Sequence, residues 1–241
     1  MATRLRPACG RGAVISWLRR AGRWPPRGAI RFGALRQSTP ISRVFGFDRG
    51  QPIDRFYVEA FLQMHAGDIR GHVLEVAGDQ YARRFGGDRV TRCDVLHVET
   101  GRPGATIVAD LTDAPRIPSD SFDCIICTQT LQHIYRVADA IATLYRSLKP
   151  GGVLLTTVPG ISQISRFDMD RWGDYWRFTT LSTRLLCEER FQPSNTSIEA
   201  HGNVLAAVAF LHGLAAEDLR PEELDHRDAD YELVITARAV K

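Results

Sequence analysis

The sequence has almost no lysine and no long hydrophobic run, and both absences restrict what the chain can be. Of its 31 basic residues only Lys149 and Lys241 are lysines. No stretch approaches the roughly 18 consecutive apolar residues that a membrane-spanning helix needs, so we expect a soluble protein without a membrane span. The apolar run from Ala13 to Leu18 is interrupted by Ser16 and is too short for the core of a signal peptide.

The cysteines do not form a disulfide framework. They number 5, at positions 9, 93, 124, 127 and 187, without regular spacing, which favours the reducing environment of the cytoplasm. Cys124 and Cys127 form a CxxC pair, but inside FDCIICT, a run typical of a buried strand. Because residues three apart in a strand point to opposite faces, we predict that the pair binds no metal.

Three common catalytic or nucleotide-binding motifs are also absent. After the first predicted strand, AGDQYA lacks the GxGxxG pattern of a nicotinamide-binding domain. The phosphate-binding loop GxxxxGK[ST] and the nucleophile elbow GxSxG do not occur either. These absences argue against a dehydrogenase, a nucleotide hydrolase and an α/β-hydrolase.

Charge is distributed very unevenly along the 241 residues. Met1 to Arg49 contain eleven arginines and one acid, Asp48, which gives +10 and leaves −7 for the rest of a chain whose net charge is +3. The basic pI of 8.7 therefore does not indicate a nucleic-acid partner. We predict that residues 1–45 form a basic, disordered tail or an over-extended start. An arm for an anionic partner and an organellar targeting segment are the alternatives.

From Pro52 onwards the sequence reads as one α/β domain with a hydrophobic core. A hydrophobic content of 44% and a charged content of 24% are ordinary for a globular domain. Helical and strand-like patterns alternate, which predicts a parallel sheet with right-handed crossovers. The predicted helices lie near 53–64, 138–148, 181–190 and 204–214, with one or two helical turns at 79–85. The predicted strands cover 72–76, 89–95, 106–110, 122–128, 152–159, 197–200 and 231–239.

Several stretches in this order resemble class I S-adenosylmethionine-dependent methyltransferases of the small-molecule type. They are VLEVAGD (73–79), Asp94, VADLTDAPRIPSDSFDCIICTQTLQHI (108–134), LKPGGVLLTTVP (148–159) and, more weakly, DYWRFT (174–179). The resemblance implies a methyltransferase domain over residues 51–241. It also implies a Rossmann-like three-layer α/β sandwich, with a mostly parallel seven-stranded sheet and an antiparallel C-terminal strand.

The resemblance also implies where S-adenosyl-L-methionine would bind. In an open parallel sheet the ligand lies beyond the carboxyl ends of the strands. Asp94, expected at the tip of the second strand, would accept hydrogen bonds from the ribose hydroxyls, a role suited to a carboxylate. Asp110 and the backbone of Leu111 would meet the adenine. Simple turn formation is the alternative for both acids.

The methionine end of the cofactor would, on the same resemblance, lie between the first and fourth strands. Glu75 and the backbone of Ala77 and Gly78 would be near the methionine portion, and Thr128 and Gln129 near the sulfonium. The family usually has glycine two and four residues after the acid, at torsions that glycine tolerates best. Here those positions hold Ala77 and Asp79, and we expect the Asp79 side chain to crowd the methionine end.

Methyl transfer is a direct displacement, which depends mainly on alignment of the acceptor. A hydroxyl acceptor also benefits from a general base, for which His133 is the leading candidate and Tyr135, Asp174 and Tyr175 are further choices. The alternative for His133 is that it caps the following segment. Aromatic and polar residues mixed in 165–178 suit a sugar ring or another polar cyclic acceptor, unless they only pack this segment onto the core. We therefore predict an enzyme that methylates a small molecule or carbohydrate, with a catalytically inactive binding module as the alternative.

Overall fold

The computed structural model describes residue 25 and residues 28–241, and the chain divides into two units, residues 1–39 and 40–241. Most of the arginine-rich segment that was predicted to be a tail lies outside the described residues, so that interpretation stays a prediction. The described part of the first unit contains one short 3-10 helix, Gly33–Leu35. The second unit begins with a loop whose Ile41 and Ser42 N–H groups both donate to the His212 carbonyl, at 2.8 and 3.1 Å.

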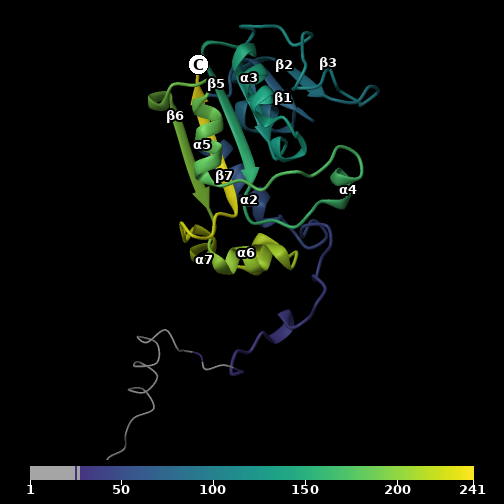
Figure 1. Ribbon diagram of the computed structural model, residues 1–241, viewed down its shortest axis with the longest axis vertical. Coiled ribbons are helices and arrows are strands. Elements are labelled where there is room, and N and C mark those ends of the chain that lie inside the picture. The colour runs from purple at the N-terminus through teal and green to yellow at the C-terminus, as the bar shows by residue number, and fades with distance from the viewer. Residues whose placement is uncertain (1–24, 26–27) are drawn as a thin grey trace, which may run out of the picture. The chain divides into compact units, whose positions relative to one another are not determined.

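The second unit is built on a seven-stranded sheet with the order β3-β2-β1-β4-β5-β7-β6 (Figure 1). β7 runs antiparallel to β5 and β6, and the remaining pairs are parallel. This confirms the predicted mostly parallel sheet with an antiparallel C-terminal strand. The strands are β1 Gly71–Val76, β2 Val90–His97, β3 Ile107–Val108, β4 Phe122–Thr128, β5 Leu148–Pro159, β6 Thr196–His201 and β7 Val234–Val240.

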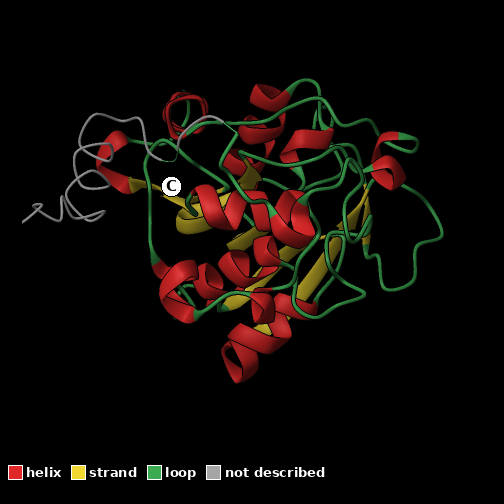
Figure 2. Ribbon diagram, turned by 90° about the horizontal axis from the view of Figure 1, so that it is seen from below, coloured by secondary structure: helices red, strands yellow, loops and turns green. Residues whose placement is uncertain are grey.

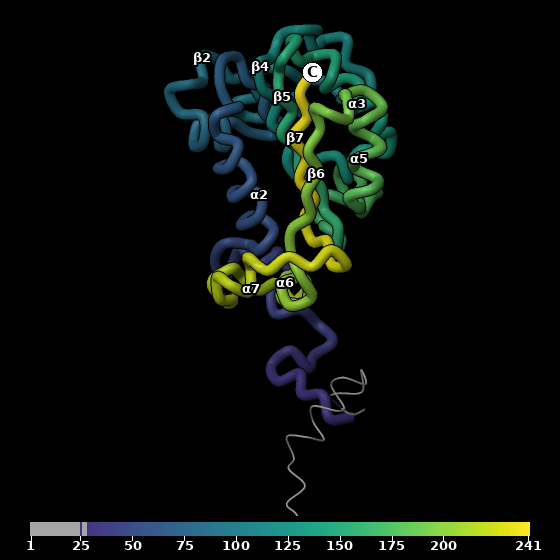
Figure 3. The backbone as a smooth tube through the Cα atoms, turned by 90° about the vertical axis from the view of Figure 1, so that its left-hand side faces the viewer, coloured from purple at the N-terminus to yellow at the C-terminus, as the bar shows by residue number. Residues whose placement is uncertain are grey.

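Helices cover both faces of the sheet (Figure 2), which gives the predicted three-layer sandwich. α3 and α5 pack on one face and α2 and α6 on the other, each through its own cluster of buried side chains. Figure 3 shows α2 and α3 on opposite sides of β5 and β7. The helices are α2 Ile53–Met64, α3 Val137–Ser147, α4 Arg166–Met169, α5 Thr180–Glu188, α6 Val204–Leu211 and α7 Pro221–Asp225. Of the described residues, none belongs to a helix long and apolar enough to cross a membrane.

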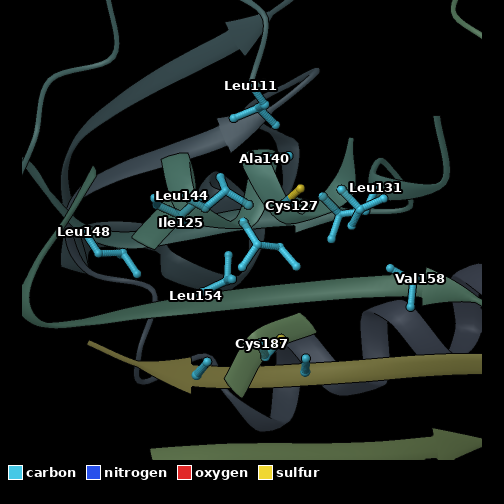
Figure 4. Close-up of a cluster of buried hydrophobic side chains, with 14 of the residues drawn as sticks. Leu111, Ile125, Cys127, Leu131, Ala140, Leu144, Leu148, Leu154, Val158 and Cys187 are labelled. Carbon is cyan, nitrogen blue, oxygen red and sulfur yellow. The ribbon is translucent and has the colours of Figure 1, made fainter. Parts of the chain in front are cut away.

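The two cysteines of the CxxC pair lie on opposite faces of β4, as the strand pattern predicts. Cys127 belongs to the cluster beneath α3 and α5 (Figure 4), and Cys124 belongs to the cluster beneath α2 and α6. Both side chains are fully buried. Burial raises the pKa of Cys127 to about 12, so this thiol is protonated at neutral pH.

Several element boundaries differ from the predicted ones. β2 continues two residues beyond Val95, because Leu96 pairs with Val76 of β1 and His97 with Val108 of β3. β3 is confined to Ile107–Val108, shorter than the predicted 106–110. The helical turns expected at 79–85 are a five-residue π-helical turn, Ala82–Gly86. Because β3 ends at Val108, Asp110 lies beyond its carboxyl end. Because β2 continues to His97, Asp94 lies inside β2 and not at its end.

Candidate functional site

The carboxyl ends of β1, β2, β3 and β4 open onto a cavity of about 1000 Å³. This is at the upper end of the range of roughly 300–1000 Å³ for small-molecule sites, which leaves room for a cofactor and part of an acceptor. The position between β1 and β4 is the switch point of the strand order, where open α/β sheets bind ligands. The strand-end residues that line it are 75–78, 96–98, 109–112 and 128–130.

Glu75 lines the cavity and also holds the loop that follows β1. Its side chain is buried, and its two carboxylate oxygens accept hydrogen bonds from the N–H groups of Ala82 at 2.7 Å and Tyr81 at 3.2 Å. Burial raises the pKa of Glu75, while these two N–H groups act in the opposite direction. The carboxylate therefore fastens the loop to the helical turn that comes after it.

The backbone of Ala77 and Gly78 forms the floor of the cavity next to this carboxylate. Ala77 has φ of +69°, the left-handed region that costs a non-glycine residue about 1–2 kcal/mol. Its N–H donates to the Leu96 carbonyl at 2.9 Å, which holds the loop in place. A Cβ added to Gly78 would meet only Glu75 Oε1, at 4.0 Å. Open space therefore lies directly over the backbone, as a ligand cradle requires.

The Asp79 side chain, which was expected to crowd this cradle, is paired with Arg83. It is not among the cavity-lining residues. Its carboxylate accepts a hydrogen bond from Arg83 Nε at 2.6 Å. Because the two residues are four apart at the start of a helical turn, their side chains lie on the same side of that turn.

Asp94 lies inside β2 rather than after it, so its predicted position at a strand end is wrong. It pairs with Leu74 in the sheet and is buried. Its carboxylate lies 2.7 Å from His72 Nε2 and accepts a hydrogen bond from the Thr106 hydroxyl at 2.8 Å. Burial opposes ionisation, but the hydrogen bonds from His72 and Thr106 lower the pKa of Asp94. Asp94 braces the sheet and does not line the cavity.

The first acidic side chain beyond the end of β2 is Glu99, which sequence reasoning missed. It directly follows the cavity-lining Val98, and its Oε1 accepts a hydrogen bond from Trp172 Nε1 at 3.0 Å. Arg102 Nε donates to the other oxygen at 2.8 Å, and this bond lowers the pKa of Glu99. The apolar alternation of RVTRCDVLHV continues to Val98, which is the signal that would have extended the strand.

The segments after β3 and β4 place the other predicted cofactor residues at the cavity. Asp110 and Leu111 both line it, and Asp110 Oδ1 accepts a hydrogen bond from the Thr112 N–H at 2.8 Å. Thr128 and Gln129 line it at the end of β4. Gln129 has φ of +46°, so two strand ends at this cavity carry a non-glycine residue in the left-handed region. Such backbone strain clusters at ligand sites.

His133 lies at the edge of the cavity in a defined tautomer. Its Nδ1 is 2.7 Å from the Gly173 carbonyl oxygen. Since a carbonyl can only accept, Nδ1 carries the hydrogen, and the lone pair of the neutral ring is on Nε2. Nε2 lies 3.2 Å from the amide nitrogen of Gln132 and 3.9 Å from Asp168 Oδ2. The arrangement is that of a base with a carboxylate nearby.

Two of the other predicted catalytic residues are placed differently from each other. Tyr175 lines the main cavity, and its ring packs edge-on against Tyr135 at 5.5 Å. Asp174 does not line that cavity. Its carboxylate is held by Arg177 through bonds of 2.6 and 3.0 Å and by the Ser165 N–H at 3.1 Å. Burial opposes ionisation, but Arg177 lowers the pKa of Asp174, which makes it a weak base.

A smaller cavity of about 130 Å³ adjoins the main one, and residues 165–178, which the sequence suggested for the acceptor, contribute to its lining. The two cavities share five lining residues, namely Phe47, Arg55, Gln129, His133 and Asp168. The smaller cavity is otherwise lined mainly by polar side chains from the start of α2, from Gln132 and from the segment after β5. His133 therefore stands on the border between the two spaces.

Comparison with known proteins agrees with this architecture. Residues 50–156 match the family model of the methyltransferase domain. A probable S-adenosylmethionine-dependent methyltransferase of Mycolicibacterium smegmatis is 30% identical over 97 residues. That similarity covers 40% of this chain and 37% of the relative, so the chain spans little more than a third of the length of the curated relative it matches.

Solved structures show the same fold at low sequence identity. A SAM-dependent methyltransferase from Archaeoglobus fulgidus has a TM-score of 0.51 and 12% identity, over 78% of this chain and 94% of that one. Phosphoethanolamine N-methyltransferase 2 of Haemonchus contortus, in complex with S-adenosyl-L-methionine, has a TM-score of 0.50 and 14% identity, over 77% of this chain and 52% of that one. Residues 50–156 thus match the methyltransferase-domain family, and the strand order and fold of residues 40–241 are those of solved S-adenosylmethionine-dependent methyltransferases.

Proposed function

We propose that this protein transfers a methyl group from S-adenosyl-L-methionine to a hydroxyl of a small polar acceptor, with carbohydrates among the candidates. The observation that carries the proposal is His133. Its tautomer is fixed by Gly173, and its Nε2 lies on the border between the strand-end cavity and the smaller polar cavity. A base in that position is suited to a hydroxyl that approaches the cofactor from the smaller cavity.

The residues at the strand ends fit the cofactor. Glu99 is next to the cavity-lining Val98 but is not itself a lining residue, and Trp172 and Arg102 occupy its two oxygens. If its side chain turned from these partners toward the cavity, Glu99 would accept hydrogen bonds from the ribose hydroxyls, the role that the family resemblance assigned to Asp94. Asp110 and the Leu111 backbone would meet the adenine. The open space over Gly78 and the floor formed by Ala77 would take the methionine portion. When bound, the cofactor supplies an electrophilic methyl group on a sulfonium.

The chemistry required of the chain is then the removal of one proton and the alignment of one oxygen. His133 Nε2 would accept the hydroxyl proton while the acceptor oxygen bonds to the methyl carbon and the bond from that carbon to the sulfonium sulfur breaks, which would leave S-adenosylhomocysteine, the methylated acceptor and a protonated His133. The Gln132 amide, which occupies Nε2 at 3.2 Å, gives way to the hydroxyl. Asp168, at 3.9 Å from Nε2, stabilises the imidazolium that results, and the Gly173 carbonyl keeps the ring oriented throughout.

Aromatic side chains at the mouth of the main cavity support a ring-shaped acceptor. Tyr135 and Tyr175 both line the cavity and are more than half exposed, at 68% and 51%. Trp176 stacks on Tyr135 with ring centroids 5.7 Å apart. Exposed aromatic faces beside polar groups are typical of sites that bind the apolar faces of sugar rings.

The His133→Asn variant tests the proposed base. Asparagine retains a side-chain N–H that can donate to the Gly173 carbonyl, but it lacks a basic nitrogen. We expect the affinity for S-adenosylhomocysteine, measured by calorimetry, to stay unchanged. We expect the rate of S-adenosylhomocysteine release, measured with neutral methyl glycosides as acceptors, to fall by about 10²–10⁴.

The control is His226→Asn, at an exposed histidine outside both cavities. We expect this variant to match the unmodified protein in both measurements. If the unmodified chain does not bind S-adenosylhomocysteine at millimolar concentration, the enzymatic proposal fails and the binding-module alternative takes its place. If His133→Asn transfers methyl groups at the normal rate, His133 is not the base.

A further inference from the structure

We infer that α6 is the contact between two copies of this chain, which associate through its exposed apolar side in an antiparallel, two-fold symmetric pair. This contact is independent of the proposed methyl transfer. Two observations support it, namely the apolar side chains that α6 exposes and the opposite charges at its two ends.

α6 lies at the surface, yet every residue of its sequence VLAAVAFL is apolar. Three alanines and Phe210 form its buried side. The exposed side carries Val204, Leu205, Val208 and Leu211, which are between 38% and 49% exposed. At 3.6 residues per turn, these four side chains fall within roughly 120° of the helix circumference. A helix that is apolar on all sides is normally buried on all sides, so this stripe calls for a partner.

The N-terminal end of α6 lies beside acidic residues. Asn203, the N-cap of α6, donates from Nδ2 to two backbone carbonyls at and just after the end of α7, at 2.7 and 2.8 Å (Figure 3). Asp225, the last residue of α7, is exposed, and no ion pair joins it to another described residue. Two further aspartates follow within the next five residues. Arg227, which lies among these acids, is paired with Glu199.

The C-terminal end of α6 lies beside basic residues. The Ile41 N–H donates to the His212 carbonyl at 2.8 Å, and the Phe45 ring packs on Phe210 with ring centroids 5.9 Å apart. Arg43 lies between these two anchors, is exposed, and pairs with no acid among the described residues. The sequence before Ile41 adds nine arginines and no acid.

Opposite charges at the two ends of one apolar stripe select a second copy in antiparallel orientation. When two such helices pack about a two-fold axis, the basic end of each copy meets the acidic end of the other, and every contact occurs twice. A parallel pair would bring like charges together, which is unfavourable. The two acids nearest the basic end do not cancel this pattern, since Asp218 is paired with Arg49 and Glu217 accepts the Gln51 N–H.

Other partners fit this side of the molecule less well. An anionic lipid surface would be repelled by the aspartates that follow α7, and a nucleic acid would leave the apolar stripe in water. A helix of eight residues is only about 12 Å long. We therefore expect a small, reversible contact, with a dissociation constant of about 10–100 µM.

Sedimentation equilibrium of the full chain measures this association. Leu205→Glu places a charge in the apolar contact and should raise the dissociation constant by about a hundredfold or more. Leu205 is the second residue of α6, a position where the helix dipole favours glutamate, so the Tm of the variant should be unchanged. The matched control is Leu181→Glu, at the second residue of α5, which is 64% exposed. It should dimerise like the unmodified chain.

Three outcomes would overturn the inference. The first is an unmodified chain that stays monomeric at about 200 µM, well above the expected dissociation constant. The second is equal weakening by Leu181→Glu and Leu205→Glu. The third is a monomeric chain that floats with phosphatidylserine vesicles and loses this property in Leu205→Glu, which would assign the stripe to a lipid surface.

Two charge reversals test the antiparallel orientation. Arg43→Glu sets acid against acid at both symmetric contacts, and Asp225→Arg sets arginine against arginine. Each variant alone should dimerise about tenfold more weakly than the unmodified chain. An equimolar mixture of the two should recover the unmodified affinity, because both contacts of the mixed pair then join opposite charges. A mixture that associates no better than the single variants overturns the antiparallel pair.

Discussion

Replacement of Ala77 by glycine should make this protein more stable, although alanine is normally the more stabilising of the two residues. Ala77 has φ of +69°, where a Cβ costs about 1–2 kcal/mol. Removal of the Cβ recovers that cost. The greater freedom of glycine in the unfolded chain takes back about 0.4–1 kcal/mol. The net gain in the free energy of unfolding is therefore roughly 0.5–1 kcal/mol, or about 1–4 °C in Tm for a domain of this size.

The same chemical change at Ala142 is the matched control. Ala142 lies within α3, where glycine costs about 0.5–1 kcal/mol relative to alanine. Urea unfolding of both variants beside the unmodified chain measures the two effects under identical conditions. The expected outcome is a difference in sign between them.

The affinity for S-adenosylhomocysteine adds a second measurement. Ala77 lines the main cavity, so Ala77→Gly should bind the ligand at least as tightly as the unmodified chain. If Ala77→Gly is destabilised as much as Ala142→Gly, the backbone at residue 77 is not strained.

Two further predictions concern the acids inside and just beyond β2, Asp94 and Glu99, and a buried histidine. Glu99→Gln should weaken S-adenosylhomocysteine binding by about 1–3 kcal/mol in calorimetry, whereas Asp94→Asn should lower the free energy of unfolding and leave the binding constant unchanged; the reverse pattern would return the ribose role to Asp94. His201 is buried against Thr236, and burial lowers its pKa to about 4, below the value of about 6.5 in an unfolded chain. Protonation therefore favours unfolding, so stability is complete above about pH 6.5 and falls by about 3 kcal/mol as the pH drops to about 4. His201→Gln should show a smaller loss over the same range in urea titrations, and an identical pH profile would contradict the burial argument.

The sheet could be predicted well from the sequence where a strand is defined by its own residues. FDCIICT contains an uninterrupted apolar stretch from Cys124 to Cys127, and β4 occupies the predicted residues 122–128. The end of β2 could not be predicted in this way. It is determined by the pairing of Leu96 with β1 and of His97 with β3, and these contacts bring together residues far apart in the chain.

The same difference between local sequence and long-range contacts separates the site residues that could be predicted from those that could not. The ends of β1 and β4 could be predicted from the sequence, and the residues predicted there line the cavity. They are Glu75, Ala77, Gly78, Thr128 and Gln129. An error of two residues at the end of β2 was enough to confuse a buried brace, Asp94, with a residue at the site. The smaller cavity has no local signal at all, because α2, the turn at His133 and the segment after β5 create it only when they meet.

The hydrogen bond from the Trp172 indole to Glu99 links binding of the cofactor to the orientation of His133, which could otherwise be independent. If Glu99 binds the ribose, arrival of the nucleoside disturbs the segment that carries Trp172, and the neighbouring Gly173 carbonyl is the group that orients His133. Binding of the nucleoside and the orientation of His133 are then energetically coupled. Because such coupling is reciprocal, an acceptor bound beside His133 changes the affinity for the cofactor by the same factor. The order in which the two ligands bind then depends on the Trp172 indole.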